Sequence, residues 1–590
     1  MYYIYINETE KNHFKKNEII LSDYRKDCHD WMKKIKVLNI NGYNSGYMRL
    51  ELYNYINLEE LSINKATYAK NYFPDFKNLN NLKILNCSNS KFNNLYEKNN
   101  FNSLIKLELL NCSNNNLSSI PHLNSCVNLT EIDCSYNNLI KLSYLTNCVN
   151  LTKLNCCNNK LKSLPYLSYC VNLIELNCSH NNLIELPYLS YCNNLIELNC
   201  SHNKLIELPK LLNKFKISKL ITLNCSYNNL IELPDLYNNL TYLNCSYNNL
   251  IVLPDLSKCV NLLELNCSYN NLIVLPNLSK CVNLQKLSCS NNELIELPDL
   301  FNCINLINVN VSYNNLTSLP KLLNLTKLIE FNCCNNKLTE LPNLFNLIKL
   351  KNLCCSYNNL IKLPYLFNLV NLIELKCKNN KLTELPNLFN LIKLKLLNCS
   401  DNNLIKLFNL SKNIKIKKLF INNNINLQKL PNLTTLINLK LLNCSNINLT
   451  ELPDLSTNKN LLYLYCNNNN LSILPNLSKC INLNGLYCFN NKLIKLPYLS
   501  HLQNLHTLFC NNNQLTTLPK LDNLVKLKKL NCKNNKLHIL PYSITQCKLH
   551  KKYLKYNKYK YVCKLSTILN FYIEKIYYIY IIKYYNSIFI

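Results

Sequence analysis

Glycine is almost absent from this sequence: Gly42, Gly46 and Gly485 are its three occurrences among 590 residues. A loop that binds nucleotide phosphates needs glycines at fixed offsets, because its backbone must approach the phosphates closely. Neither G-x-x-x-x-G-K nor G-x-G-x-x-G occurs. The sequence therefore argues against nucleotide-dependent chemistry of the common kinds.

Three further features that common protein classes require are missing. The 33 cysteines include no Cys-x-x-Cys pair, so neither a zinc site nor any other metal or cofactor is expected. Residues 1–6 have no basic lead and run directly into polar residues, which argues against a signal peptide. The apolar stretch 576–582 is too short for a membrane-spanning helix. We therefore expect a cytoplasmic protein.

Positive charge is plentiful, and its distribution is uneven. The formal net charge is +31 in a sequence that is rich in lysine and poor in alanine and arginine, as an AT-rich genome would encode. Glutamates such as Glu175 and Glu197 recur beside lysines inside the chain. We therefore expect a solvated positive surface rather than nucleic-acid binding. The densest basic stretch lies near the C-terminus and consists of Lys548, Lys551, Lys552, Lys555, Lys558, Lys560 and Lys564.

A 22-residue repeat fills most of the chain. Starting at Leu173, the sequence reads L-I-E-L-N-C-S-H-N-N-L-I-E-L-P-Y-L-S-Y-C-N-N, and it begins again at Leu195. Repeats of this length form stacked units, each of which buries its apolar side against the next. With Leu173 as position one, position six is a cysteine in most units and Ile or Val in the others.

The cysteines at position six are expected to be reduced and buried. Equivalent residues on adjacent parallel strands lie about 4.8 Å apart and point the same way, so their Cβ atoms exceed the ~3.8 Å typical of a disulfide. Cysteine then acts as a small hydrophobic residue. The repeated Asn-Cys-Ser tripeptides would be glycosylation sites in a secretory pathway and would mask the strand face. Both observations favour an intracellular, reducing compartment.

Within one unit, polar and apolar residues alternate over Leu176–Ser179, which predicts a short strand. Pro187 and the short return leg argue against a regular helix, so extended or 3₁₀ structure is expected there. A second row of buried cysteines is predicted on this leg, as at Cys170 and Cys192.

The pattern L-x-x-L-x-L-x-x-N-x-L, with cysteine as its sixth residue, resembles the leucine-rich repeat family. The resemblance covers residues 35–541, in about 23 units. It implies an α/β-type solenoid, a curved horseshoe with a concave parallel β-sheet and a convex side of extended or 3₁₀ segments. Residues 1–34 are then an N-terminal cap and residues 542–590 a Lys-, Tyr- and Ile-rich C-terminal cap or tail, because solenoid ends need covers.

The resemblance also implies a ladder of buried asparagines at position nine, whose side chains bond the turn backbones of neighbouring units. Ser90 and Ile447 interrupt it, and one residue is inserted between Ile421 and Leu427, so these units are expected to be irregular. The ladder comprises Asn115, Asn137, Asn159, Asn181, Asn203, Asn228, Asn248, Asn270, Asn292 and equivalent residues onward to Asn535.

Positions five, seven and eight are expected to face the concave surface. Position five is mostly asparagine and position seven mostly serine, which makes a polar, uncharged surface. Position eight departs from this pattern at Tyr227, Tyr247 and Tyr269, which we expect to form an aromatic row. Tyrosine is common at interfaces, so the row is a candidate partner-binding site. The alternative is that the rings only stack on one another.

A second departure lies in the later repeats, where position five turns aromatic, with Asn443 as an interruption. A contiguous apolar patch on a soluble protein usually marks a contact site, so we expect partner binding here. The alternative is a contact with the C-terminal tail. The candidate residues are Phe420, Tyr463, Tyr465, Tyr487, Phe489 and Phe509.

Catalytic residues are not apparent. His180 and His202 lie one unit apart without an exposed acidic or cysteine ligand, so we expect surface histidines rather than a metal site. Cys157, Cys334 and Cys354 each adjoin a core cysteine and are expected to point outward. No electropositive group is arranged around them in the sequence, so they are expected to be inert.

The sequence thus predicts a non-enzymatic, monomeric scaffold or adaptor that binds an unidentified protein partner on its concave face. One alternative is a polyanion binder, of nucleic acid or an anionic membrane, which acts through the lysine-rich tail. Another is a substrate receptor of a ubiquitin ligase, although residues 1–34 are short for a domain that recruits the ligase.

Overall fold

The computed structural model describes residues 2–6, 33–41, 44–45, 55–64, 67–68, 76–93, 101–209, 219–541, 551–553, 557 and 561–563. The chain forms two compact units: unit 1, Met1–Lys337, and unit 2, Leu338–Ile590. Most of the expected caps, residues 1–34 and 542–590, and nearly all of the lysine-rich stretch lie outside the described residues. The boundaries of the caps therefore stay predictions.

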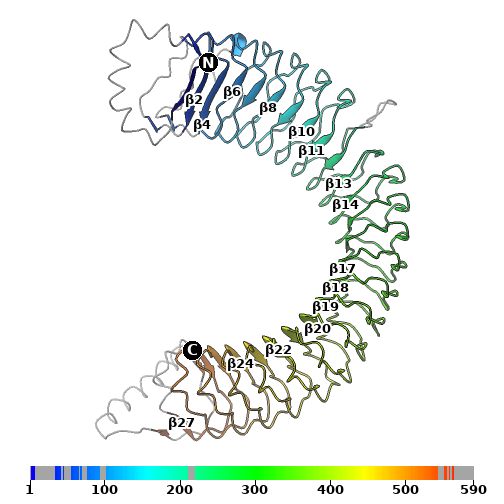
Figure 1. The fold of residues 1–590 in the computed structure, drawn as a ribbon, viewed down its shortest axis with the longest axis vertical. Coiled ribbons are helices and arrows are strands. Elements are labelled where there is room, and N and C mark those ends of the chain that lie inside the picture. Colours follow the sequence, from blue (N-terminus) through cyan, green and yellow to red (C-terminus); the bar gives the residue numbers. More distant parts are fainter. Residues whose placement is uncertain are drawn as a thin grey trace, which may run out of the picture. The chain divides into compact units, whose positions relative to one another are not determined.

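Unit 1 is built from short parallel strands, each lying beside the next along the chain (Figure 1). Equivalent positions of the repeat are in register, so that Leu176 pairs with Leu198. A small second sheet joins β3 and β5. The elements are β1 (Tyr2–Ile6), β2 (Ile35–Asn41), β3 (Asn44–Ser45), β4 (Glu60–Asn64), β5 (Thr67–Tyr68), β6 (Ile84–Asn86), the 3₁₀ helix η3 (Phe101–Ser103), β7 (Leu109–Asn111), β8 (Glu131–Asp133), β9 (Lys153–Asn155), β10 (Glu175–Asn177), β11 (Glu197–Asn199), β12 (Thr222–Asn224), β13 (Tyr242–Asn244), β14 (Glu264–Asn266), β15 (Lys286–Ser288), β16 (Asn308–Asn310) and β17 (Glu330–Asn332).

Unit 2 repeats the same construction. Its strands pair in parallel and in register from β18 to β26, and β28 adds to the edge of β26. A separate pair joins β27 and β29. The strands are β18 (Asn352–Cys354), β19 (Glu374–Lys376), β20 (Leu396–Asn398), β21 (Lys418–Phe420), β22 (Leu441–Asn443), β23 (Tyr463–Tyr465), β24 (Gly485–Tyr487), β25 (Thr507–Phe509), β26 (Lys529–Asn531), β27 (Ile539–Pro541), β28 (Lys551–Tyr553) and β29 (Tyr561–Cys563).

The regular strand is three residues long and covers positions three to five. It therefore begins one residue earlier than the alternation over Leu176–Ser179 predicts, and ends two residues earlier. Leu176 at its centre is buried, whereas Glu175 and Asn177 on either side are half-exposed. Successive side chains of a strand point to opposite faces, so positions three and five share the outer face.

The core confirms the predicted buried phase. In the unit that starts at Leu173, the buried side chains include Leu176, Cys178, Leu183 and, on the return leg, Cys192. The return leg has no regular helix, and η3 is the only helix within the described residues. The fold is the predicted repeat solenoid, with extended and turn segments opposite the sheet.

The asparagine ladder at position nine is present. Asn181 is representative: its Nδ2 donates to Cys156 O at 3.0 Å, Cys178 O at 3.1 Å and Ser179 O at 3.2 Å, while its Oδ1 accepts from Leu161 N at 3.0 Å. These bonds satisfy backbone groups that would otherwise be buried without partners.

The predicted irregular units are also found. Beyond position eight, Lys91 and Asn448 are the two described residues with positive φ, 54° and 60°, and they lie in the units of Ser90 and Ile447. After the insertion, Asn424 keeps its place in the ladder, and Leu427 N closes an added turn onto Asn424 O at 3.0 Å.

A second asparagine row, not predicted from the sequence, lies at position 22, directly before the strand. Asn172 Nδ2 donates to Val149 O at 3.2 Å, and Asn371 Nδ2 does the same to Ile348 O at 2.8 Å. Some units carry lysine at this position, and Lys393 Nζ then donates to Asn371 Oδ1 at 2.7 Å. In both units, side-chain amides directly before the strands thus bond the backbone of the preceding repeat.

Candidate functional site

The outer face of the sheet carries positions three and five, and position eight lies beyond the strand. The expectation that position seven belongs to this exposed surface is wrong for its serines. Ser179 is only 4% exposed, and its Oγ donates to Asn177 Oδ1 at 2.8 Å. The serine hydroxyl points toward the sheet, and its hydrogen bond to the amide oxygen of position five holds it there.

Position eight has an unusual backbone. Its residues adopt the left-handed conformation in unit after unit, for example Tyr227 with φ 54° and Asn490 with φ 51°. Asparagine tolerates this region, whereas for tyrosine it costs roughly 1 kcal/mol or more. Six tyrosines hold the position nevertheless: Tyr136, Tyr227, Tyr247, Tyr269, Tyr313 and Tyr357.

In unit 1, side chains at position eight form a continuous aromatic stack, which comprises His180, His202, Tyr227, Tyr247 and Tyr269. The ring centroids are 4.0 Å apart for the histidine pair and 4.1 Å for each later pair, with interplanar angles of 10–12°. The two candidate histidines are therefore stacking partners, and the inner rings are covered on both faces.

Hydrogen bonding accompanies this stacking. Bonds to the hydroxyls of Tyr269 and Tyr227 raise the pKa of Tyr247 well above its usual value. The stack therefore offers solvent its ring edges and a row of hydroxyl groups, rather than ring faces. The expected row is present and its rings stack on one another, while its role as a partner-binding site stays a prediction.

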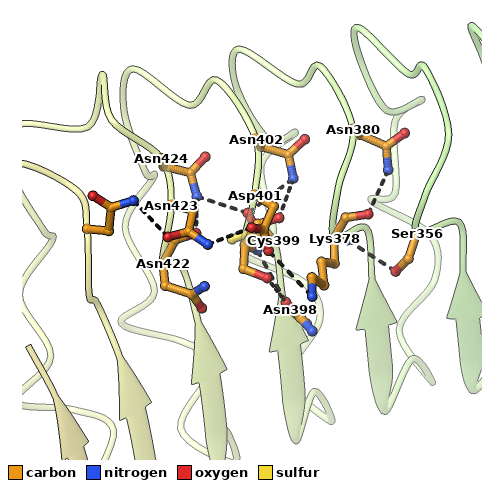
Figure 2. Close-up of polar contacts among 12 residues, drawn as sticks. Ser356, Lys378, Asn380, Asn398, Cys399, Asp401, Asn402, Asn422, Asn423 and Asn424 are labelled. Atoms are coloured by element: carbon orange, nitrogen blue, oxygen red, sulfur yellow. Dashed lines mark hydrogen bonds and ion pairs between the residues drawn. The ribbon is translucent and has the colours of Figure 1, made fainter. Parts of the chain in front are cut away.

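In unit 2, position eight carries Tyr357 and then, from Asn379 onward, amides and the carboxylate of Asp401 (Figure 2). Asn423 Nδ2 donates to Asp401 Oδ1 at 2.6 Å, and Asn446 Nδ2 donates in turn to Asn423 Oδ1 at 2.9 Å. Lys378 Nζ lies 3.6 Å from Asp401 Oδ2 and 5.3 Å from the ring centroid of Tyr357. A hydrogen bond to Tyr357 and the charge of Asp401 raise the pKa of Lys378. The row is polar, and Asp401 Oδ2 is a buried atom in it that has the ion pair with Lys378 but no hydrogen bond.

Four aromatic residues of unit 2 occupy positions three and five of the sheet itself. We define the aromatic cluster as Tyr463, Tyr465, Tyr487 and Phe509, which lie on β23, β24 and β25. The Tyr465 and Tyr487 rings stack at 4.4 Å, Tyr487 meets Phe509 edge-on at 5.5 Å, and Tyr463 lies 6.3 Å from Tyr465. All four side chains are half-exposed. The sequence prediction of an aromatic patch here is supported by direct ring contacts.

Gly485 makes room for this cluster, a role the sequence did not reveal. It stands at position three of β24, where the neighbouring strands carry Tyr463 and Thr507. A Cβ atom at Gly485 would lie 2.8 Å from Tyr487 Cε2 and 2.9 Å from Tyr463 Cδ1. The two tyrosine rings therefore lie over the glycine backbone, in space that a side chain takes in other units.

Two candidate aromatics lie apart from the cluster. Phe420 on β21 is separated from Tyr465 by Asn443, because the three residues are paired in register across successive strands. Phe489 stands at position seven, after β24, and is half-exposed. The structure thus brings together four of the six predicted residues by ring contact.

The thiols differ from expectation at one position. Cys157 is buried, with 6% of its surface exposed, so its predicted outward orientation is wrong, while Cys334 and Cys354 are half-exposed as expected. Cys354 also has a basic neighbour, because Lys376 pairs with it in register. Burial raises the pKa of the core thiols, to about 12 for Cys200.

Neither metal ligation nor a transmembrane helix is found in the described part of the chain. No group of three or more His, Cys, Asp or Glu side chains is placed there to hold a metal ion. Among the same residues, no helix is long and apolar enough to cross a membrane.

Sequence reasoning also missed the charges at position three. In unit 1 this row includes Glu175 and Glu197, which are paired in register on β10 and β11. In unit 2 it includes Lys418 on β21. The alternation around the central leucine of each strand was the signal that could have identified this row.

Comparison with known proteins identifies the repeats. A family model described as leucine-rich repeats (two copies) matches residues 105–147 and 149–190. YopM from Yersinia enterocolitica WA-314 is 30% identical, the alignment covers 78% of this chain and 87% of YopM, and the TM-score is 0.57. No curated protein sequence matches at a significant level.

Two further solved structures are informative. The functional domain of InlJ from Listeria monocytogenes, which includes a cysteine ladder, is 29% identical, with 63% of this chain and 75% of that chain covered and a TM-score of 0.51. The plant peptide hormone receptor RGFR1, in complex with RGF2, is 23% identical, with 89% and 95% covered and a TM-score of 0.69. The second similarity concerns the fold alone.

Proposed function

The chain belongs to the leucine-rich repeat family, and we propose that it is a scaffold or adaptor that binds a protein partner on the outer face of its sheet. Members of this family typically act as non-enzymatic interaction scaffolds, and extended repeat surfaces commonly bind other proteins. We take this strand face to be the concave one, as the family resemblance implies.

The observation that carries the proposal is the aromatic cluster. Tyr463, Tyr465, Tyr487 and Phe509 offer contiguous, half-exposed ring surface, and burial raises the pKa of the Tyr465 hydroxyl. Tyrosine and phenylalanine supply large contact areas with few rotatable bonds, which is why aromatic residues dominate binding energy at interfaces. Gly485 keeps the space in which two of these rings lie. We propose this cluster as the anchor of the interface.

The remaining candidate residues have secondary places in this proposal. Phe420 lies two strands from Tyr465 on the same sheet face and extends the surface, and Phe489 lies at its turn end. Tyr227, Tyr247 and Tyr269 are 37–44% exposed and offer a partner their ring edges and hydroxyls. These residues are expected to add contact area rather than to anchor.

We further propose a monomer in a reducing, cytoplasmic compartment. The support for the compartment is that the cysteines from Cys87 to Cys532 form no disulfides and that all of them other than Cys334 and Cys354 are buried. Oxidation of a buried core thiol adds polar atoms where the packing has no space for them. The polyanion alternative depends on a tail outside the described residues and stays a prediction, as does the ligase-receptor alternative.

The test is crosslinking affinity purification of the full chain from cells, followed by mapping of the crosslinked residues. The test variant is Tyr465→Ala/Tyr487→Ala/Phe509→Ala. We expect a partner that crosslinks near β23–β25 of the parent and is captured about tenfold less by the variant, since each anchor ring contributes a large share of binding energy.

The matched control is Tyr144→Ala/Tyr166→Ala/Tyr188→Ala, which removes three highly exposed tyrosines from the return legs of unit 1. Circular dichroism checks that both variants stay folded. Equal capture by the parent and the cluster variant, or crosslinks confined to other surfaces, would show that the cluster is not the anchor.

A further inference from the structure

Six exposed lysines gather at the start of three consecutive strands of unit 2, at positions 22, two and three of their repeats. The strands are β20, β21 and β22, and Leu396, Lys418 and Leu441 are paired in register across them. We call these six residues the lysine patch. They are Lys393, Lys395, Lys415, Lys417, Lys418 and Lys440.

Three of the lysines are stacked by the backbone. Lys417 N donates to Lys395 O at 2.8 Å, and Lys440 N donates to Lys417 O at 2.8 Å. Lys395, Lys417 and Lys440 therefore follow one another at the strand spacing of about 4.8 Å. Like charges this close repel one another, although salt reduces the effect at an exposed site.

None of the described ion pairs involves a lysine of the patch; the nearest acidic residue in register, Glu374 on β19 beside Leu396, is paired with Lys376. The described ion pairs of unit 2 lie elsewhere, at Lys376–Glu374, Lys378–Asp401, Lys406–Glu384 and Lys429–Glu451. The polar contact of the patch is the bond from Lys393 Nζ to Asn371 Oδ1. The other five ammonium groups have no described side-chain partner and are available to an anionic ligand, and Lys393 keeps further donors beside its bond to Asn371.

The surroundings of the patch favour a protein segment over a nucleic acid. Apolar side chains lie among the lysines: Leu396 and Leu441 flank Lys418 at position three, and Phe420 follows at position five. Binding of single-stranded nucleic acid uses free ring faces on which bases stack. Here the stacking of Tyr465 on Tyr487 at 4.4 Å covers one face of each ring, and Phe509 meets Tyr487 edge-on, so fewer ring faces are free for bases. Alternating charge and apolar surface instead suits a peptide with acidic and apolar residues.

The patch is also continuous with the proposed anchor. Leu441 of β22 pairs in register with Tyr463, the first residue of the aromatic cluster. On the far side of the cluster, β26 brings exposed Lys528 and Lys529. The cluster is therefore bordered by lysines on both sides.

We propose that the lysine patch binds an acidic segment of the partner protein, one in which Asp or Glu alternates with leucine or aromatic residues. The proposal rests on the proposed function, since it assigns the chemistry of the partner that the aromatic cluster anchors. The apolar residues of the segment contact Leu396, Phe420 and the cluster, while its carboxylates meet the ammonium groups.

The experiment measures binding of short fluorescein-labelled peptides to the full chain by fluorescence anisotropy. The probe alternates Glu with Leu and Phe; one control peptide replaces Glu by Gln, and another replaces Leu and Phe by Gly. Lys395→Gln/Lys417→Gln/Lys440→Gln is the test variant. Lys362→Gln/Lys381→Gln/Lys495→Gln, which removes three exposed lysines from the turns of unit 2, has the same net charge and is the control.

We expect the test variant to bind the probe about tenfold more weakly than the control variant, since each exposed charge pair contributes a few-fold and three are lost. Both control peptides should bind the parent more weakly than the probe. Lys395→Arg/Lys417→Arg/Lys440→Arg should restore binding. Equal affinity of the two glutamine variants, or equal binding of the uncharged peptide, would overturn the proposal.

Three further arms separate this proposal from its neighbours. Tighter binding of a single-stranded oligonucleotide or of phosphatidylserine vesicles than of the probe would overturn the assignment of a protein segment. If binding of the probe depended on the lysines but not on Tyr465 and Tyr487, the proposal of an acidic segment would stand and the proposal of an aromatic anchor would be refuted. If binding of the probe depended on the rings alone, the proposed function would stand and the proposed role of the lysine patch would be refuted.

Discussion

The two units place their aromatic side chains at different positions of the same repeat. Unit 1 has rings at position eight over asparagines at position five, and the later part of unit 2 has the reverse. The rings of unit 1 repeat at 4.0–4.1 Å, whereas those of unit 2 contact one another at 4.4–6.3 Å in mixed orientations. A regular stack presents the same surface in every repeat. A partner that must recognise one place on the sheet therefore needs an irregular arrangement such as the aromatic cluster.

Charge at position three differs between stretches of the sheet rather than between whole units, since Lys153 and Lys286 hold it in unit 1 and Glu374 holds it in unit 2. Position three of unit 1 has Glu175 and Glu197 side by side, while β20–β22 of unit 2 carry uncompensated lysines around Lys418. Both sequences satisfy the repeat equally well, because position three faces solvent in either case. The repeat therefore determines the scaffold, and its variable outer positions are free to determine what is bound.

The largest expected effect tests the part that the two units share. Asn270→Ala in unit 1 removes three donor bonds and the acceptor of Leu250 N, and Asn491→Ala in unit 2 removes the equivalent set. Since the partners stay buried without bonds, each variant should lose about 3–5 kcal/mol in the free energy of unfolding. Urea unfolding measures this loss.

Asn271→Ala is the control for this comparison, because Asn271 is exposed and lies at the next position. We expect less than about 0.5 kcal/mol for it. A clearly smaller loss at Asn491 than at Asn270 would mean that the ladder does not support the two units alike.

The next comparison separates stacking from backbone strain at position eight. Tyr247→Asn loses two stacked neighbours but relieves a φ of 55°, so it should lower stability by about 1 kcal/mol. Tyr136→Asn relieves a φ of 53° at a tyrosine that is 54% exposed, and should raise stability by about 1 kcal/mol. Thermal and urea unfolding give both changes in stability. If the two substitutions changed stability in the same direction, a stabilising role of the stack would be refuted.

Gly485→Ala tests the irregular cluster with a smaller change in stability. The added Cβ must displace the Tyr463 and Tyr487 rings, but alanine is the better strand residue, so the free energy of unfolding should change by less than about 1 kcal/mol. Near-ultraviolet circular dichroism should change because the ring contacts change, and partner binding should weaken. Thr507→Ala at the same position of β25 is the control; an unchanged spectrum for Gly485→Ala would contradict the described packing.

The scaffold could be predicted from the sequence because the buried positions repeat. Leu176, Cys178 and Asn181 have the same neighbours in the units before and after, so one pattern defines both packing and hydrogen bonds. Position seven was assigned wrongly because a serine is short enough to turn inward and bond the amide of position five. Composition does not reveal that choice.

The candidate site was predictable only in part, for a different reason. The aromatic residues of unit 2 are visible in the sequence, but the space at Gly485 is filled by the Tyr463 ring of the neighbouring strand β23 and by the Tyr487 ring of its own strand β24. The lysine patch likewise exists only when residues 22 positions apart are placed in register. Both features belong to the outer face, where no packing rule constrains the sequence.

The smallest expected effect concerns the histidines that begin the stack of unit 1. Burial, and then repulsion from His180 at 4.0 Å, lower the pKa of His202 below its usual value of about 6.5. The unfolded chain therefore takes up a proton that the folded chain resists, so stability should fall as the pH drops through about 6.5. His202→Asn keeps a residue that tolerates a φ of 54° and should remove this part of the pH dependence.

Urea unfolding of the parent and His202→Asn at about pH 7.5 and about pH 5.5 checks this expectation, since other groups titrate alike in both proteins. Identical pH dependence of the two would contradict it. In His180→Asn, NMR titration should show a pKa of His202 that rises only part of the way toward its usual value, because burial is the larger cause. A complete return of the His202 pKa to its usual value would instead assign the lowered pKa to the neighbouring His180 ring. The histidine pair would then be the contact of the stack that responds to charge, because the tyrosines of the stack stay neutral at physiological pH.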